Sequence, residues 1–129
     1  TVLLERRKET PTLRIKKALN LNPGEKVIYL KRLRYAEEIP IIIVDSYLSY
    51  SKYSQLLDVP TKDFSKDLYK IIKNLFNVSI VKSDREVTAT NMSLQDANLL
   101  NEEIWRSCIR LVAINYIENN EPCEFFDSR

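Results

Sequence analysis

Histidine is absent from this sequence of 129 residues. Its absence removes the commonest general base, the commonest zinc ligand and every nucleophile arrangement that depends on an imidazole. A catalytic interpretation must therefore use carboxylates, lysine or tyrosine. The two cysteines, Cys108 and Cys123, do not have the spacing of metal ligands. We interpret them as free buried thiols, and we expect neither a metal nor a cofactor.

Long apolar runs are also absent. No stretch approaches the roughly 20 apolar residues that a helix needs to cross a bilayer. The first eight residues, from Thr1 to Lys8, do not form a signal peptide. We therefore expect a cytoplasmic protein with no membrane contact. The chain does not begin with methionine, which we interpret as the mark of a piece of a longer protein.

A strong block of one charge is missing as well. The net charge is +2, from 20 basic and 18 acidic residues. Binding to the DNA backbone needs a concentrated basic face, and this chain has only two short basic clusters, at 6–8 with 16–17 and at 31–34. We do not expect these residues alone to bind DNA. The composition, 44% hydrophobic and 29% charged, is typical of one globular domain over 1–129.

Hydrophobic periodicity predicts alternating strands and helices. Strands are expected over 1–8, 25–35, 39–48, 78–90, 108–117 and 121–127, helices over 11–20, 65–76 and 93–100, and a helical turn over 51–57. Thr10 is the expected cap of the first helix. The strands at 25–35 and 39–48 form a tight hairpin.

The two halves of the chain resemble each other. Laying 18–20 onto 99–101, an offset of 81, also lays Arg34-Tyr35 onto Asn115-Tyr116, and one turn residue later Pro40 falls on Pro122. Each half is then strand, helix and two strands. We infer an internal duplication, although two similar hairpins could agree by chance. The expected fold is α+β, a six-stranded antiparallel sheet flanked by helices, with both prolines at strand starts or edges.

Arg32 and Arg34 are the most informative residues of the first hairpin. Residues i and i+2 of a strand share a face, so the two guanidinium groups point the same way. Such a pair suits the recognition of a phosphate or carboxylate. The alternative is a solvated basic face that binds nothing.

A set of short motifs occurs in a recognisable order: Pro23-Gly24-Glu25-Lys26-Val27, Arg32-Leu33-Arg34-Tyr35-Ala36, Pro40, Ser46-Tyr47-Leu48, Leu68-Tyr69, Ala89, Asp96-Ala97, Leu99-Leu100, Pro122 and Glu124. Over nearly its whole length the chain resembles the UTRA domain, the effector-sensing C-terminal half of GntR-type transcription regulators of the HutC subfamily. The resemblance implies a fold similar to chorismate lyase, a homodimer and a small anionic effector such as a phosphosugar or a carboxylate. Operator DNA would be bound only through an N-terminal winged helix-turn-helix, which these residues do not contain.

The resemblance also assigns site residues. It implies that Arg32 and Arg34 clamp the anionic group of the effector, that Tyr69 donates a hydrogen bond at the start of a helix, and that Glu124 accepts one from the effector. Ser65, at the start of the same predicted helix, completes the candidate set. Without the resemblance, Tyr69 is equally well interpreted as a core residue and Glu124 as a surface charge.

Two positions depart from the family pattern. Val44 stands where the family often has a glutamate that meets the effector, which favours a more apolar ligand. Asp67 stands where a serine usually caps the helix, and its carboxylate would compete with an anion for the arginines. Asp67 could instead select a cationic group, pair with an arginine, or point away while Ser65 caps the helix. Both departures weaken the expectation of a phosphosugar.

Three functions remain open at this point. The leading one is a sensing and dimerising domain in which effector binding moves the helix at 65–76 and shifts the conformation of the whole regulator. A chorismate lyase-like enzyme would need Glu124 or Asp67 as its acid or base. A dimerisation domain without an effector is the third. A strand edge at Ile41–Ile43 is the suspected dimer interface.

Overall fold

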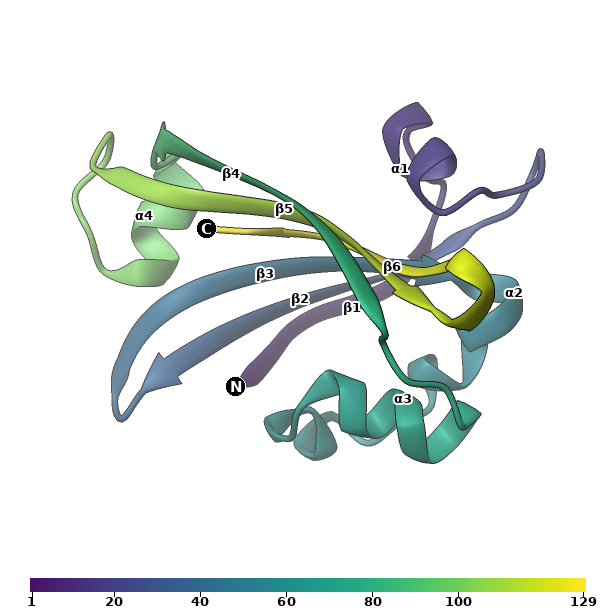
Figure 1. Cartoon of the computed structure of the whole chain (residues 1–129). Coiled ribbons are helices and arrows are strands. Elements are labelled where there is room, and N and C mark those ends of the chain that lie inside the picture. Colours follow the sequence, from purple (N-terminus) through teal and green to yellow (C-terminus); the bar gives the residue numbers. More distant parts are fainter.

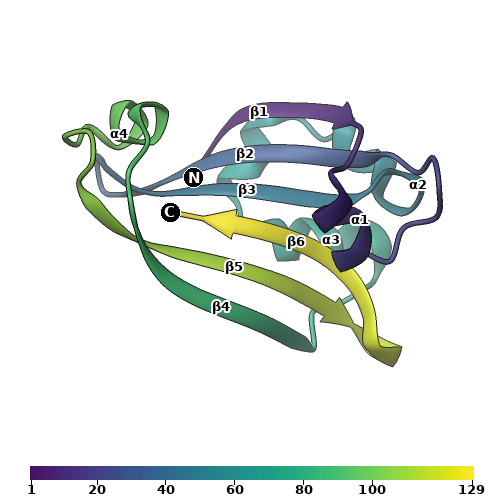
Figure 2. The same ribbon diagram turned by 90° about the horizontal axis from the view of Figure 1, so that it is seen from above.

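The computed structural model describes all 129 residues and contains one sheet of six antiparallel strands in the order β1-β2-β3-β6-β5-β4 (Figures 1 and 2). The strands are β1 (Val2–Glu9), β2 (Val27–Ala36), β3 (Ile39–Ser49), β4 (Lys82–Asn91), β5 (Ser107–Ile117) and β6 (Glu121–Ser128). The predicted α+β fold and all six predicted strands are confirmed. The strand expected from residue 78 begins four residues later, because Val78 and Ile80 pack against the core beneath the central helix instead.

The strand order mirrors itself about the centre of the sheet, as the duplication predicts. The first half contains α1 (Leu13–Ala18) between β1 and β2, and the second contains α4 (Leu94–Leu100) between β4 and β5. In the first hairpin the register shifts after Arg34, where Tyr35 pairs with Pro40. In the second it shifts after Asn115, where Tyr116 pairs with Pro122. The aligned residues thus form matching bulges, and each proline is the second residue of its strand.

The helices divide between the two faces of the sheet. The linking segment between the halves contains α2 (Tyr50–Tyr53), the 3-10 helices η1 (Ser54–Leu57) and η2 (Thr61–Ser65), and α3 (Leu68–Phe76). This segment covers one face, which we name the α3 face, and lies below the sheet in Figure 1. Helices α1 and α4 cover the opposite face, the α1/α4 face, where α1 packs on Val27 and Phe125 and α4 packs on Leu33 and Ile43.

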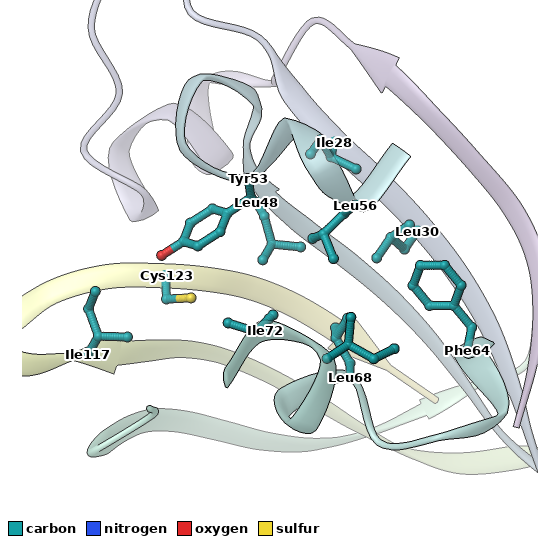
Figure 3. Close-up of a cluster of buried hydrophobic side chains, with 11 residues drawn as sticks. Ile28, Leu30, Leu48, Tyr53, Leu56, Phe64, Leu68, Ile72, Ile117 and Cys123 are labelled. Carbon is teal, nitrogen blue, oxygen red and sulfur yellow. The ribbon is translucent and has the colours of Figure 1, made fainter. Parts of the chain in front are cut away.

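The main core lies between α3 and the sheet (Figure 3). Leu68, Ile71 and Ile72 recur at helical spacing, so one side of α3 is apolar and meets Leu30 and Leu48 from the central strands. Leu68 and Leu48 are completely buried. Truncating such a leucine to alanine costs about 2–5 kcal/mol, so this contact fixes α3 on the sheet.

Two of the predicted helix starts are wrong, by two residues in α1 and by three in α3. Helix α1 is capped by Thr12, whose hydroxyl accepts a hydrogen bond from the Ile15 amide at 3.4 Å, and Thr10 is outside it. Helix α3 begins at Leu68, and Asp67 rather than Ser65 is its cap. In each case the side-chain oxygen nearest to the free amides of the first turn decides the start, which periodicity alone does not resolve.

The suspected edge at Ile41–Ile43 is wrong for Ile43, whereas Ile41 and Ile42 have a strand neighbour only on the β2 side. Strand β3 is an internal strand, because it pairs with β2 on one side and its second half pairs with β6 on the other. Ile43 is completely buried beneath α4 and exchanges two backbone hydrogen bonds with Arg129. Ile41 stays exposed only because it is the extra residue of the bulge. The edges of the sheet are β1 and β4.

Candidate functional site

The strand register aligns a row of side chains across the α3 face. Arg32 on β2 lies opposite Val44, Val44 opposite Ser128, and Ser128 opposite Leu111. Beyond the N-terminal end of α3 this row forms the floor of a cavity of about 520 Å³. Four of the five predicted site residues line this cavity: Arg32, Arg34, Ser65 and Tyr69. The register therefore brings strand β2 and the start of α3 to one place.

Arg32 is buried and only partly hydrogen-bonded. It is 8% exposed, and its Nη2 atom donates a hydrogen bond to the Ser46 hydroxyl at 2.8 Å. The same nitrogen lies 3.9 Å from Glu124 Oε2, and the Arg32 Nε atom has no partner. An unsatisfied buried polar group costs about 1–3 kcal/mol, and more when it is charged. Arg32 therefore has free hydrogen-bonding capacity that an anion could use.

The fifth predicted residue, Glu124, lies behind the cavity wall. It is completely buried, and its Oε1 atom accepts hydrogen bonds from the Tyr69 hydroxyl at 3.0 Å and from Asn115 Nδ2 at 2.8 Å. Its Oε2 atom has no hydrogen-bond partner. Burial raises the pKa of the Tyr69 hydroxyl, and the neighbouring Glu124 carboxylate raises it further, so the phenol stays protonated. Tyr69 separates Glu124 from the open part of the cavity.

Two further arginines line the cavity without an acidic partner. Arg34 is exposed and lies within 4.0 Å of no carboxylate. Arg85 reaches the cavity from β4, at the opposite edge of the sheet. Sequence reasoning missed Arg85, since only the strand order shows that β4 closes this side of the same face. The predicted strand over 78–90 was the only available signal.

The geometry can now be compared with that of known proteins. The family model for the UTRA domain matches residues 1–129. The chain belongs to the UTRA domain family. No curated protein matches the chain.

Several solved structures share the UTRA fold. One is described as the ligand-binding domain of a GntR-family transcriptional regulator from Bordetella bronchiseptica, with a TM-score of 0.89, 27% identity and coverage of 98% of this chain and 80% of that one. A GntR-family regulator from Enterococcus faecalis V583 has a TM-score of 0.86 and 23% identity, and the match covers 98% of this chain and 88% of that one. The effector domain of PhnF from Mycobacterium smegmatis has a TM-score of 0.90 and 16% identity, and the match covers 98% of this chain and 76% of that one. The last two likenesses, below 25% identity, concern the fold alone.

Asp67 has a defined role in this UTRA domain. Its Oδ1 atom accepts a hydrogen bond from the Tyr69 amide at 3.0 Å, and it thereby caps α3. Asp67 lies within 4.0 Å of no cationic group, so it does not pair with Arg32 or Arg34. Ser65 belongs to η2 and does not cap the helix. The side chain that occupies the helix N-terminus here is thus negatively charged, which disfavours an anion at that point.

Val44 makes the cavity floor of the UTRA domain apolar. It packs with Ala113 and Phe126, and Leu111 lies beside them. Val44 and Phe126 are each only 8% exposed. The cavity floor therefore combines these apolar side chains with Arg32 and Ser128, an arrangement that suits an anion with an apolar body.

The opposite face carries a second charged cluster, which is fully paired. Arg129 donates to Asp45 Oδ2 at 2.7 Å and to both carboxylate oxygens of Asp96, at 2.8 and 3.0 Å. Arg110 binds both oxygens of Asp127, at 3.1 and 2.6 Å. Burial alone would lower the pKa of Arg129, but its hydrogen bonds to Asp96 and Asp45 outweigh that effect and raise it. The charges of both arginines are thus neutralised by carboxylates of the chain itself.

Other expected properties concern thiols, metals and membranes. Both cysteines are free; Cys123 is completely buried, whereas Cys108 is only half-buried. Burial raises the pKa of the Cys123 thiol to about 11, which makes it a poor nucleophile. No group of three or more cysteine or carboxylate side chains is arranged to hold a metal ion. None of the helices is both long enough and apolar enough to span a bilayer.

Proposed function

We propose that this UTRA domain senses a small anionic metabolite for a bacterial GntR-type transcription regulator. The observation that carries the proposal is the cavity in which buried Arg32 keeps an unpartnered nitrogen and Arg34 has no acidic partner. UTRA domains of GntR regulators generally bind effectors, which supports this assignment. The apolar floor around Val44 favours a carboxylate or phosphate with an apolar body over a phosphosugar.

The proposed signal leaves the cavity through the N-terminal strand. Thr1 lines the cavity, and Leu3 on β1 lies opposite Arg32 on β2. An anion held between Arg32 and the start of α3 would contact two elements at once: α3 itself and β2, the strand that pairs with β1. Binding would then shift the population of conformations of β1 and α3. In the whole regulator, a cytoplasmic homodimer, this shift would change how another domain binds operator DNA.

Ligand binding to the purified domain tests the proposal. A panel of phosphosugars, amino acids and aromatic acids is screened by thermal unfolding, and hits are measured by calorimetry. A true effector at 100 times its dissociation constant stabilises the fold by about 2.7 kcal/mol. Arg32→Gln should abolish this gain. Lys62→Gln, an exposed charge outside the cavity, should leave it unchanged.

Three results would count against sensing. If no compound stabilises the domain, it serves only to pair subunits. If Arg32→Gln binds the hit as well as the wild type does, the cavity is not the site. If a bound aromatic acid is converted to a product, the domain is a lyase-like enzyme. We expect binding without turnover, because the buried Glu124 already accepts two hydrogen bonds and Asp67 caps a helix.

A further inference from the structure

A second compartment adjoins the cavity on the far side of Tyr69. It has a volume of about 500 Å³ and lies between α3 and strands β4 and β5. Tyr69 and Arg85 line both compartments, so the two compartments adjoin each other at these side chains. The charged residues of the second compartment are Lys70, Lys73 and Arg85, and no carboxylate lines it.

None of these three cations has an ionic partner. No carboxylate lies within 4.0 Å of the Lys70, Lys73 or Arg85 charges, although other pairs of residues on this chain make such contacts, as in Arg129 with Asp45. Arg85 uses its Nε atom to donate a hydrogen bond to the Ser83 hydroxyl at 3.1 Å, which fixes the side chain and leaves both terminal nitrogens free. The compartment thus concentrates positive charge that nothing in the chain neutralises.

The three cations are exposed, and they line one hollow from two different elements. Lys70 and Lys73 are three residues apart on one helix, where like charges repel each other. Arg85 comes from a strand and adds a third charge to the same hollow. Asn74 and Ser79 in the wall can also donate hydrogen bonds, whereas the Asn115 amide already donates to the Tyr69 hydroxyl and to Glu124. Helix α3, strand β4 and the segment between them therefore supply donors and cations to one concave site.

We propose that this second compartment is an anion subsite and that the effector carries two anionic groups. The first group lies at Arg32 and Arg34, and the second lies across Tyr69 at Lys70, Lys73 and Arg85. This inference rests on the proposed function, because it assumes that the first compartment binds the effector. The ligand class is a small molecule with two terminal anions, either carboxylates or phosphates, joined by a body that fits over the Tyr69 ring.

A matched series of synthetic anions tests the subsite. Straight-chain α,ω-dicarboxylates and alkyl bisphosphates of increasing length are titrated by calorimetry, each beside the monoanion of equal length. The two arms separate carboxylate from phosphate chemistry. We expect a dianion of optimal length to bind at least roughly tenfold more tightly than its monoanion, the gain of one charge-assisted contact. In Lys70→Gln/Lys73→Gln and in Arg85→Gln, this ratio should fall towards one.

The control is Lys62→Gln, which removes one positive charge from the same region but lines neither compartment. It should keep the full ratio. The subsite is disproved if dianions and monoanions bind the wild type equally, if no dianion binds at all, or if the double lysine variant keeps the ratio. Monoanion binding that Arg32→Gln abolishes, with no advantage for a dianion, would disprove the subsite alone and leave the proposed function intact.

Discussion

The arginines on the two faces of the sheet differ in whether carboxylates neutralise them. On the α1/α4 face, Arg129 and Arg110 are held by carboxylates with short bidentate or bridging contacts. On the α3 face, Arg34 and Arg85 have no acidic partner, and Arg32 has an unused nitrogen. The difference shows that arginine content does not identify a ligand site. The criterion on which the proposed site rests is free hydrogen-bonding capacity in a concave place.

The duplication explains why one face needs its arginines for structure. The offset that places Pro40 on Pro122 also places Asp45 on Asp127, and these two carboxylates lie directly opposite each other in neighbouring central strands. Opposed like charges destabilise a sheet. Arg129 and Arg110 offset that repulsion. On the other face the neighbouring positions are Val44 and Ser128, and the one carboxylate within 4.0 Å of Arg32, Arg34 or Arg85 is Glu124, at 3.9 Å from Arg32.

The largest expected effect is that of Arg129→Gln. It leaves the buried carboxylates of Asp45 and Asp96 without the Arg129 cation, and removal of one partner of a buried ion pair costs about 3–5 kcal/mol. Urea denaturation measures the loss. Arg110→Gln, whose side chain is 38% exposed, should cost clearly less. Equal losses would mean that burial does not distinguish the two pairs.

A smaller loss is expected from Asn115→Ala. The variant removes one of the two hydrogen bonds to buried Glu124, which leaves that carboxylate further undersatisfied, and it should cost about 1–3 kcal/mol. Thermal unfolding checks this value against Asn74→Ala, an exposed position on α3 where little change is expected. If both variants behave alike, the Tyr69–Glu124–Asn115 network does not support the site.

The unpaired arginines should behave in the opposite way. Arg34→Gln and Arg85→Gln remove charges with no partner, so the free energy of unfolding should change by less than about 0.5 kcal/mol. Denaturation curves of both variants are compared with the curve of Arg129→Gln. A loss as large as that of Arg129→Gln would place these arginines among the structural ones.

The smallest expected effect is that of Asp67→Ser. Serine caps a helix about as well as aspartate, so stability should change by only a few tenths of a kcal/mol. Removing the carboxylate should strengthen the binding of inorganic phosphate at low salt by up to about fivefold, the equivalent of about 1 kcal/mol for one charge pair in water. Glu103→Gln, an exposed acid far from the cavity, provides the control for net charge. Equal affinities in both variants would show that Asp67 does not limit anion binding.

Local patterns were sufficient for most of the fold. The period-two strands, the amphipathic α3 and the two aligned prolines predicted the strands, the central helix and the equivalent places of Pro40 and Pro122 near the strand starts. The helix starts at Thr12 and Asp67 were missed, because a cap depends on which oxygen reaches the free amides. The supposed edge at Ile41–Ile43 is wrong at Ile43 for another reason. A hairpin pattern shows which two strands pair, but it does not show that β6 covers the other side of β3.

The sequence by itself determined that Arg32 and Arg34 share a strand face and that the chain repeats a strand-helix-hairpin unit, since both depend only on spacing along the chain. Tertiary structure decided which cations stay unpaired. Strand order carried Arg85 and the lysines of α3 to the same cleft, and it placed Glu124 behind Tyr69. Charge neutralisation depends on distances between residues far apart in sequence, and only the folded register sets those distances.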